Sequence, residues 1–319
     1  MPLVDMPLEE LKKYRGITPC PDDFDQYWQK ACDEMHAIDA RVELIPADFQ
    51  VPNAECFDLY FTGMDNSRIH AKYVRPKNAQ APHPAVVEFH GYYGNAGSWN
   101  TKLNYVSQGF SIAAMDVRGQ AGYSDCLGAI RGSNYQGQII RGLEDRPEKL
   151  LFRSIFLDAL QLTEIVMRLP EVDPDRVGVF GMSQGGGLSI ASAALNPRIR
   201  RVGIYYPFLS DYKRVWQMDL CKDAYLELAN HFRQKDPTHE HEDEIFTKLG
   251  YIDVKNLAHR IRGEVMMACG LMDTIVPPSA QFAAYNRITS KKSLRIYPDY
   301  GHEPIPHYED ELFRFMLGL

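Results

Sequence analysis

The sequence contains 319 residues, of which 45% are hydrophobic and 24% are charged, and this composition excludes a disordered or fibrous chain. The formal net charge of −7 gives no electrostatic reason to bind nucleic acid or an anionic membrane, because both need clustered Lys and Arg. We therefore expect a single α/β domain over residues 1–319 that carries an insertion and acts on a neutral or small partner.

The beginning of the chain and its cysteines favour a cytoplasmic protein. The opening MPLVDMPLEELKKYRG has early acidic residues and lacks a basic head before an apolar run, so we expect neither a signal peptide nor a transmembrane segment. The six cysteines lack C-x-x-C spacing, which is typical of reduced thiols. Residues 1–11 are rich in apolar side chains without an obvious core role, so they either cover a neighbouring chain or pack on their own domain.

The next elements change from one helix to alternating strands and helices. Residues 21–38 place apolar side chains at steps of three and four, which predicts an amphipathic helix. The stretches CFDLYFTG (56–63) and RIHAKYVRP (68–76) flank a polar turn and predict an antiparallel hairpin. From residue 85, short apolar runs alternate with helical patterns, the longest over 150–169. This alternation predicts a mainly parallel sheet flanked by helices.

One region interrupts the alternation. Between about residues 208 and 260 the sequence has helical, strongly polar patterns and no buried-strand run. We predict a helical cap over the C-terminal edge of the sheet and call residues 208–260 the insertion. His239 and His241 lie in a charged run there, and such runs are more typical of a solvated face than of a metal site.

The stretch GMSQGGG (181–187) surrounds one serine with glycines directly after an apolar run. The residues before it predict a strand and those after it a helix, so Ser183 is expected at a strand-to-helix turn. The pattern G-x-S-x-G is typical of a nucleophile, because small neighbours let strand and helix approach while the hydroxyl projects above the sheet. Glycine-rich turns also bind phosphate, but this one lacks the P-loop ending and the dinucleotide spacing.

Two later residues complete a candidate catalytic triad with Ser183. Asp273 follows the apolar run EVMMACG, and His302 follows SLRIYPD, so both are expected at the strand ends where Ser183 lies. A serine needs such a base, and the base needs an acid that fixes its tautomer. Weaker candidates for the acid or base are Asp243, Asp253, Asp299 and His307.

Backbone N–H groups are predicted to bind the oxyanion of the reaction intermediate. Gln184 follows the serine at a helix N-terminus, where N–H groups are free. The loop HGYYG (90–94) resembles the HGGG-type loop of lipases and esterases, and we choose Tyr92 as its donor, with His90 as a brace for the loop. Tyr92, Tyr206 and Phe208 are candidate substrate-binding residues, and Tyr93 is a further aromatic residue near the site; core packing explains Tyr206 and Phe208 equally well.

Three segments together resemble a known family. Arg118-Gly119-Gln120, the stretch GMSQGG and His302-Glu303 resemble the signature of carbohydrate esterase family seven, the acetyl xylan esterases or cephalosporin-C deacetylases. The opening VDMPL (4–8) is also similar, so the resemblance spans nearly the whole chain. It implies an α/β-hydrolase fold, the triad and oxyanion donors named above, and no metal or organic cofactor. Arg118 and Gln120 also read as structural supports, since a guanidinium can hold a carboxylate or carbonyl groups.

The resemblance further implies a substrate and an assembly. It implies removal of acetyl groups from xylo-oligosaccharides and cephalosporin C by an intracellular homo-hexamer whose sites face an internal cavity. A peptidase of the prolyl-oligopeptidase type shares the fold, but only about 80 residues precede the first core strand, too few for a β-propeller. A binding protein on a hydrolase scaffold is the non-enzymatic alternative, although such proteins generally lack a triad member.

Overall fold

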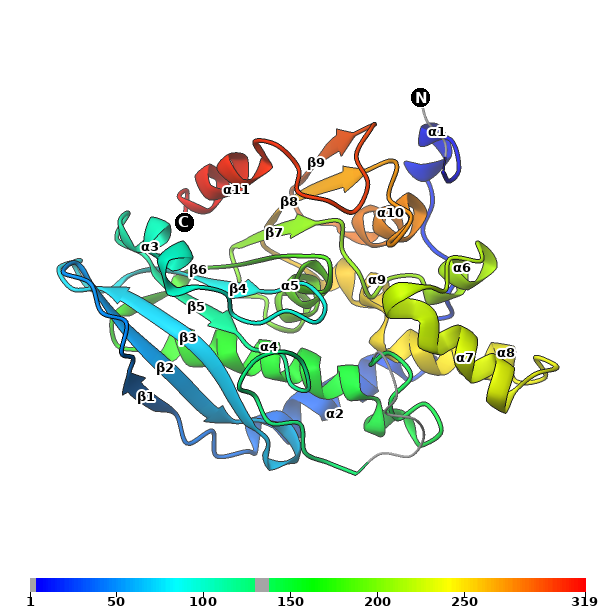
Figure 1. The fold of residues 1–319 in the computed structure, drawn as a ribbon, viewed down its shortest axis with the longest axis horizontal. Helices are drawn as coiled ribbons and strands as arrows, with labels where there is room; N and C mark the ends of the chain where they lie inside the picture. Colours follow the sequence, from blue (N-terminus) through cyan, green and yellow to red (C-terminus); the bar gives the residue numbers. More distant parts are fainter. Residues whose placement is uncertain (1–3, 130–137) are drawn as a thin grey trace.

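This computed structural model describes residues 4–129 and 138–319. A nine-stranded sheet with helices on both faces forms the centre of the protein (Figure 1). The strand order is β1-β2-β3-β5-β4-β6-β7-β8-β9. The strands are β1 (Glu43–Pro46), β2 (Ala54–Thr62), β3 (Arg68–Pro76), β4 (His83–Phe89), β5 (Ser111–Met115), β6 (Val172–Met182), β7 (Arg201–Tyr205), β8 (Glu264–Gly270) and β9 (Lys292–Tyr297).

The sheet is mainly parallel, as predicted. From β5 to β9 in the strand order every neighbouring pair is parallel, and β1, β2 and β3 extend one edge in antiparallel register. Val87 on β4 lies between Ala113 on β5 and Val179 on β6, and all three side chains are fully buried. Continuous apolar runs are required where helices cover both faces, which is the pattern that the sequence shows here.

The hairpin and the longest helix also match the prediction, whereas β1 was missed. β2 pairs with β3 from Ala54 opposite Pro76 to Thr62 opposite Arg68. The edge strand β1 is short and almost wholly exposed, so it has no alternation of apolar and polar residues by which to recognise it.

Eleven α-helices and six short 3₁₀ helices occur in the described residues. The α-helices are α1 (Leu8–Leu11), α2 (Phe24–His36), α3 (Leu103–Val106), α4 (Leu151–Arg168), α5 (Gln184–Leu195), α6 (Tyr212–Gln217), α7 (Leu226–Lys235), α8 (Glu242–Leu249), α9 (Val254–Leu257), α10 (Pro278–Arg287) and α11 (Tyr308–Met316). The 3₁₀ helices are η1 (Met64–Asn66), η2 (Trp99–Lys102), η3 (Pro147–Lys149), η4 (Asp223–Tyr225), η5 (Gly250–Ile252) and η6 (Ala258–Arg260). None of these helices has the length and apolar character needed to cross a membrane.

The helix α4 is buried on nearly all sides because it lies between the sheet and α2. Trp28 on α2 is fully buried and stacks on Phe156 of α4, with ring centroids 5.8 Å apart. The predicted apolar stripe of α2 is therefore the surface that covers α4. Truncating such a buried aromatic side chain to Ala typically costs about 3–5 kcal/mol of stability.

The insertion contains helices and loops but no strand, and it packs on the main body. Figure 1 places α6, α7 and α8 beyond the ends toward which β7 and β8 point. That the insertion caps this edge stays a prediction. Its buried residues Phe232, Phe246 and Leu249 belong to the same hydrophobic cluster as Phe156 of α4. Because the cluster is continuous, the insertion has no separate core of its own.

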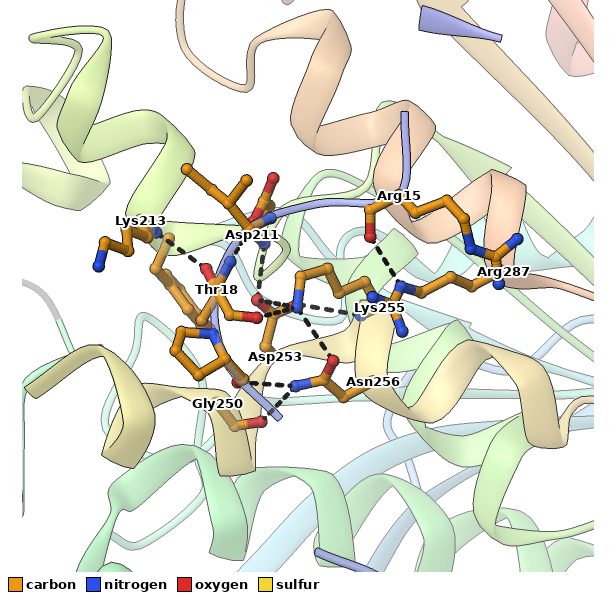
Figure 2. A network of polar contacts seen from close by, with 12 residues as sticks. Arg15, Thr18, Asp211, Lys213, Gly250, Asp253, Lys255, Asn256 and Arg287 are labelled. Carbon is orange, nitrogen blue, oxygen red and sulfur yellow. Dashed lines mark hydrogen bonds and ion pairs between the residues drawn. The ribbon is translucent and has the colours of Figure 1, made fainter. Parts of the chain in front are cut away.

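The start of the insertion is bonded to the N-terminal segment (Figure 2). Asp211 is fully buried and accepts hydrogen bonds from the Tyr14 hydroxyl and from the backbone N–H groups of Ile17 and Thr18, each at 2.8 Å. A buried carboxylate is costly unless its oxygens are hydrogen-bonded, so these three donors hold the segment against the insertion.

The end of the insertion contacts the same segment. Lys255 is fully buried; its ammonium donates to the Thr18 carbonyl at 2.6 Å and lies 3.5 Å from the Asp253 carboxylate. Asp253 in turn accepts from the backbone N–H of Asp211 at 2.9 Å. This network, drawn in Figure 2, joins both ends of the insertion to residues 14–18, and we call it the clasp.

Candidate active site

Ser183 lies at the turn between β6 and α5 in a strained backbone conformation. Its φ is 54° and its ψ is −116°, a region that residues with a side chain rarely adopt. Such strain costs of order 1–3 kcal/mol and clusters at functional sites. The turn is held because the Ser183 N–H donates to the Tyr205 carbonyl at 3.0 Å and its carbonyl accepts from the Gly187 N–H at 3.1 Å.

The glycines around Ser183 allow β4 and α5 to approach each other closely. A Cβ atom at Gly181 or at Gly185 would collide with the Phe89 carbonyl oxygen at the end of β4. Any side chain at these two positions would therefore displace the turn that carries Ser183. Glycines flank Ser183 in the sequence because larger side chains would not fit there.

Asp273 and His302 are paired. Asp273 follows β8 and is fully buried, and His302 lies between β9 and α11 with 14% of its side chain exposed. The His302 Nδ1 atom is 2.8 Å from Asp273 Oδ2. With Nδ1–H donating to the carboxylate, Nε2 is the nitrogen left to accept a proton. The carboxylate bonded to His302 is Asp273 and none of the three weaker acid candidates.

Asp273 accepts from four donors within the part of the chain that the structure describes. Its Oδ1 accepts from the backbone N–H groups of Ile275 at 2.9 Å and Val276 at 2.8 Å. Its Oδ2 accepts from His302 and also from the side-chain amide of Gln281 at 3.1 Å. The sequence reasoning missed Gln281, whose only signal is a polar residue within the otherwise apolar stretch AQFAA of α10.

Ser183 and His302 lie at the same edge of the sheet without a direct hydrogen bond between them in the described residues. Tyr206, directly after β7, packs on His302 with ring centroids 4.4 Å apart. Hydrogen bonds between catalytic residues are often long until substrate binds, so this geometry is compatible with a nucleophile and its base.

Gln184, one of the two predicted oxyanion donors, is the first residue of α5. Its N–H has no acceptor within the helix, as for every first-turn N–H. Its side chain is fully buried and exchanges two hydrogen bonds with Gln120, at 2.6 and 3.1 Å. Nearby, Arg118 forms a bidentate pair with Asp158 at 2.6 and 2.8 Å. Gln120 thus supports the side chain of Gln184, and Arg118 supports the carboxylate of Asp158 and the Met64 carbonyl.

The loop that carries Tyr92, the other predicted donor, is braced by His90. The Val117 N–H donates to His90 Nε2 at 3.0 Å, and His90 Nδ1 lies 2.7 Å from the Gly91 carbonyl. These contacts require a neutral ring with the proton on Nδ1, and burial lowers the pKa of His90 in the same sense. Tyr92 is half-buried and packs on Tyr93, with ring centroids 4.2 Å apart.

Two of the three predicted substrate-binding residues are buried. Tyr206 and Phe208 are 0% and 1% exposed, so neither offers a surface to a ligand in this structure. Tyr206 lies against His302, and burial raises its pKa to about 12, while Phe208 supports Tyr92 at 5.7 Å between centroids. Among the described residues, Tyr93 and Met182 beside the site are exposed, at 54% and 41%. The sequence places Tyr93 near the site but gives no indication of Met182.

Known proteins resemble this chain throughout its length. A family model described as acetyl xylan esterase (AXE1) matches residues 1–319. Acetyl xylan esterase 1 from Thermoanaerobacterium sp. JW/SL YS485 is 59% identical, with a TM-score of 0.97 over 98% of this chain and 99% of that one. The acetyl xylan esterase from Paenibacillus sp. R4 is 34% identical, with a TM-score of 0.91 and the same two coverages.

A curated relative, the acetyl esterase Axe7A of Xylanibacter ruminicola, is 28% identical over 308 residues. The match covers 92% of this chain but 65% of the relative, so the chain spans less than two thirds of that protein. The likeness to solved structures confirms the predicted α/β-hydrolase fold. Because the family model matches every residue from 1 to 319, the chain belongs to the acetyl xylan esterase (AXE1) family.

Proposed function

We propose that this protein is a serine esterase that removes acetyl groups from small acetylated carbohydrates through an acyl-enzyme intermediate. The observation that carries the proposal is the strained Ser183 at the start of α5, on the sheet edge where Asp273 is bonded to His302. Membership of the acetyl xylan esterase family supports the same reaction class. A strained serine near a paired histidine and carboxylate is the arrangement that acyl transfer needs.

Each proposed catalytic residue has a separate task. Ser183 Oγ attacks the acetyl carbonyl carbon while His302 Nε2 takes its proton, and Asp273 orients the ring and stabilises its cationic form. The N–H groups of Tyr92 and Gln184 donate to the carbonyl oxygen as it becomes negative. His302 then protonates the departing sugar oxygen. Water attacks the acetyl-serine by the same steps and releases acetate.

The family supports a proposal for the substrate and setting. We propose short acetylated xylo-oligosaccharides as substrates, because two relatives are named acetyl xylan esterases, and the acetyl ester of cephalosporin C, because the resemblance to carbohydrate esterase family seven implies it. The half-buried Tyr92 would wall a small acyl pocket, and the exposed ring of Tyr93 would stack on a sugar. We further propose a cytoplasmic location and a homo-hexameric assembly.

A series of esters of one alcohol tests the acetyl preference. We expect kcat/KM to decrease in the order acetyl, propionyl, butyryl, octanoyl. Where the acyl chain no longer fits the pocket, each further lengthening should lower kcat/KM by about tenfold or more, because overfilling a small pocket costs about 1–3 kcal/mol. Active enzyme is counted with a fluorophosphonate probe that labels the nucleophile. Equal rates on acetyl and octanoyl esters would contradict the proposed pocket, and absence of labelling would contradict the serine mechanism.

A further inference from the structure

We propose that Gln281 is a positioning residue of the catalytic site, which holds the Asp273 carboxylate in the orientation that His302 requires, and that Asp5 holds the helix carrying Gln281. This inference rests on the proposed role of Asp273. It concerns two residues, one of them near the start of the chain, that lie outside the triad and the oxyanion site.

The amide of Gln281 contacts the same carboxylate oxygen as the histidine. Gln281 is fully buried in the first turn of α10, and its Nε2 donates to Asp273 Oδ2 at 3.1 Å and to the Val276 carbonyl at 2.7 Å. His302 Nδ1 lies 2.8 Å from that Oδ2 atom. The two backbone donors fix only Oδ1. Gln281 therefore fixes the oxygen on which the orientation of the imidazole depends.

The orientation of this amide is determined by its neighbours. In the reverse orientation the Gln281 carbonyl oxygen would face the Asp273 carboxylate and the Val276 carbonyl, two acceptors without a proton to share. The observed orientation leaves Gln281 Oε1 buried without a hydrogen-bond partner. A buried acceptor without a partner lowers the free energy of unfolding, so a glutamine at position 281 is unfavourable for stability. This is the pattern expected where donation to Asp273 is needed for function.

Asp5 caps the helix that carries Gln281. The N-terminus of α10 begins with two prolines and has no capping side chain of its own. The Asp5 side chain, 1% exposed, accepts from the Ser279 N–H at 2.8 Å and from Arg214 at 2.7 Å, and Arg214 also donates to the Ser279 hydroxyl at 3.1 Å. Ser279 is the first residue of α10 with an N–H to give. Asp5 thus satisfies the free donor two residues before Gln281.

Two substitutions at Gln281 separate positioning from packing. Gln281→Met keeps a similar volume without a donor, and we expect kcat to fall by about tenfold to hundredfold with KM within about twofold. In Gln281→Glu, the new carboxyl beside Asp273 stays protonated at low pH and can donate its one proton to Asp273, but it repels Asp273 once ionised. Its rate relative to the wild type should therefore decrease from about pH 6 to 9, whereas that of Gln281→Met stays constant.

Gln161→Met is the matched control. Gln161 on α4 is also buried, donates through Nε2 to the Thr62 carbonyl at 3.0 Å and has its Oε1 without a partner, but it does not contact Asp273. We expect this variant to lose stability at unchanged kcat. A wild-type kcat in folded Gln281→Met, or an equal loss in both methionine variants, would overturn the positioning role.

A double-variant cycle tests Asp5. If Asp5 acts through Gln281, Asp5→Ala lowers kcat in the wild type and has no further effect on kcat in Gln281→Met. Independent, multiplicative losses would overturn the link. The low-field proton resonance of His302 Nδ1–H gives a readout without turnover: it should move in Gln281→Met and remain in Gln161→Met. If the wild type hydrolyses no ester but the resonance moves, the proposed function fails while the positioning stands.

Discussion

At the scale of single residues, the strained backbone conformation of Ser183 lowers the stability of the fold, although the proposed chemistry needs that conformation. The serine occupies φ 54° and ψ −116°, which glycine adopts without penalty. The hydroxyl contributes no hydrogen bond to the described fold, so its removal should not unfold the protein. Activity and stability therefore make different demands at this position.

We expect Ser183→Ala and Ser183→Gly to lose on the order of a millionfold in kcat, as loss of a catalytic nucleophile does. Ser183→Gly should in addition be more stable than Ser183→Ala by ~1 kcal/mol, because glycine relieves the positive φ. Urea unfolding of both variants measures the difference. A residual rate above about a tenth of the wild type would contradict the nucleophile assignment.

The sequence predicts the triad positions because chain order and strand ends determine them. Ser183, Asp273 and His302 each follow an apolar run, and the ends of parallel strands meet at one edge. It leaves open whether Tyr206 and Phe208 are buried, because the positive φ of Tyr206, 26°, interrupts the alternation that would show which side chain points inward. Asp5 contacts Ser279 from 274 positions away, and Gln281 contacts Asp273 from 8 positions away across a loop, so no periodic pattern in the sequence indicates either contact.

At the scale of elements, local periodicity predicts those helices and strands whose burial follows their own apolar pattern. The strands of the parallel sheet and the helix α2 have patterns strong enough to recognise. The insertion looks polar in sequence, yet α8 buries Ile245, Phe246 and Leu249 on one side. A short helix with charges on its other faces has a low average hydrophobicity, and only the structure reveals how much of it belongs to the core.

The buried carboxyl of Asp253 makes the stability of the clasp depend on pH. Burial raises the pKa of Asp253 from its ordinary value of 3.8 to about 6, against the opposing effect of Lys255. Between about pH 4 and 6 the folded state then binds a proton that the unfolded chain has lost, so this group's contribution to the free energy of unfolding decreases as pH rises. A shift of two pKa units corresponds to ~3 kcal/mol.

Urea unfolding of the wild type and of Asp253→Asn between pH 4 and 7 isolates this contribution, since the other carboxylates titrate in both proteins. The stability of the wild type relative to the variant should decrease by up to ~3 kcal/mol over this range and then level off. A constant difference would show that the carboxyl is ionised throughout, held so by its ion pair with Lys255.

At the scale of the whole molecule, the described part of the N-terminal segment packs on its own domain. Met6, Leu8 and Leu11 contact an apolar cluster formed by Cys269, Leu271 and Phe282 of the same chain. Of the two alternatives for residues 1–11, packing on the same domain therefore describes residues 4–11, and residues 1–3 lie outside the described part. The proposed hexamer depends on the family resemblance alone.

A hexamer with inward-facing sites should restrict the size of substrates. Light scattering at micromolar concentration should give about six times the 36.4 kDa of one chain, a mass that persists on dilution if the assembly is obligate. Acetylated xylo-oligosaccharides should then react much faster than acetylated polymeric xylan, with acetate release as the measurement. A monodisperse monomer that rapidly deacetylates the polymer would contradict both the assembly and the restricted access.

The clasp and the Asp5 cap also constrain the order in which the chain can fold during synthesis. Tyr14 and Asp211 are 197 positions apart, Thr18 and Lys255 are 237 apart, and Asp5 and Ser279 are 274 apart. Residues 5–18 therefore lack these partners until Asp211, Lys255 and Ser279 have been synthesised, and their docking must follow the synthesis of those later segments. By the same connectivity, the acid of the proposed triad reaches its final support only when Asp5 has docked on α10.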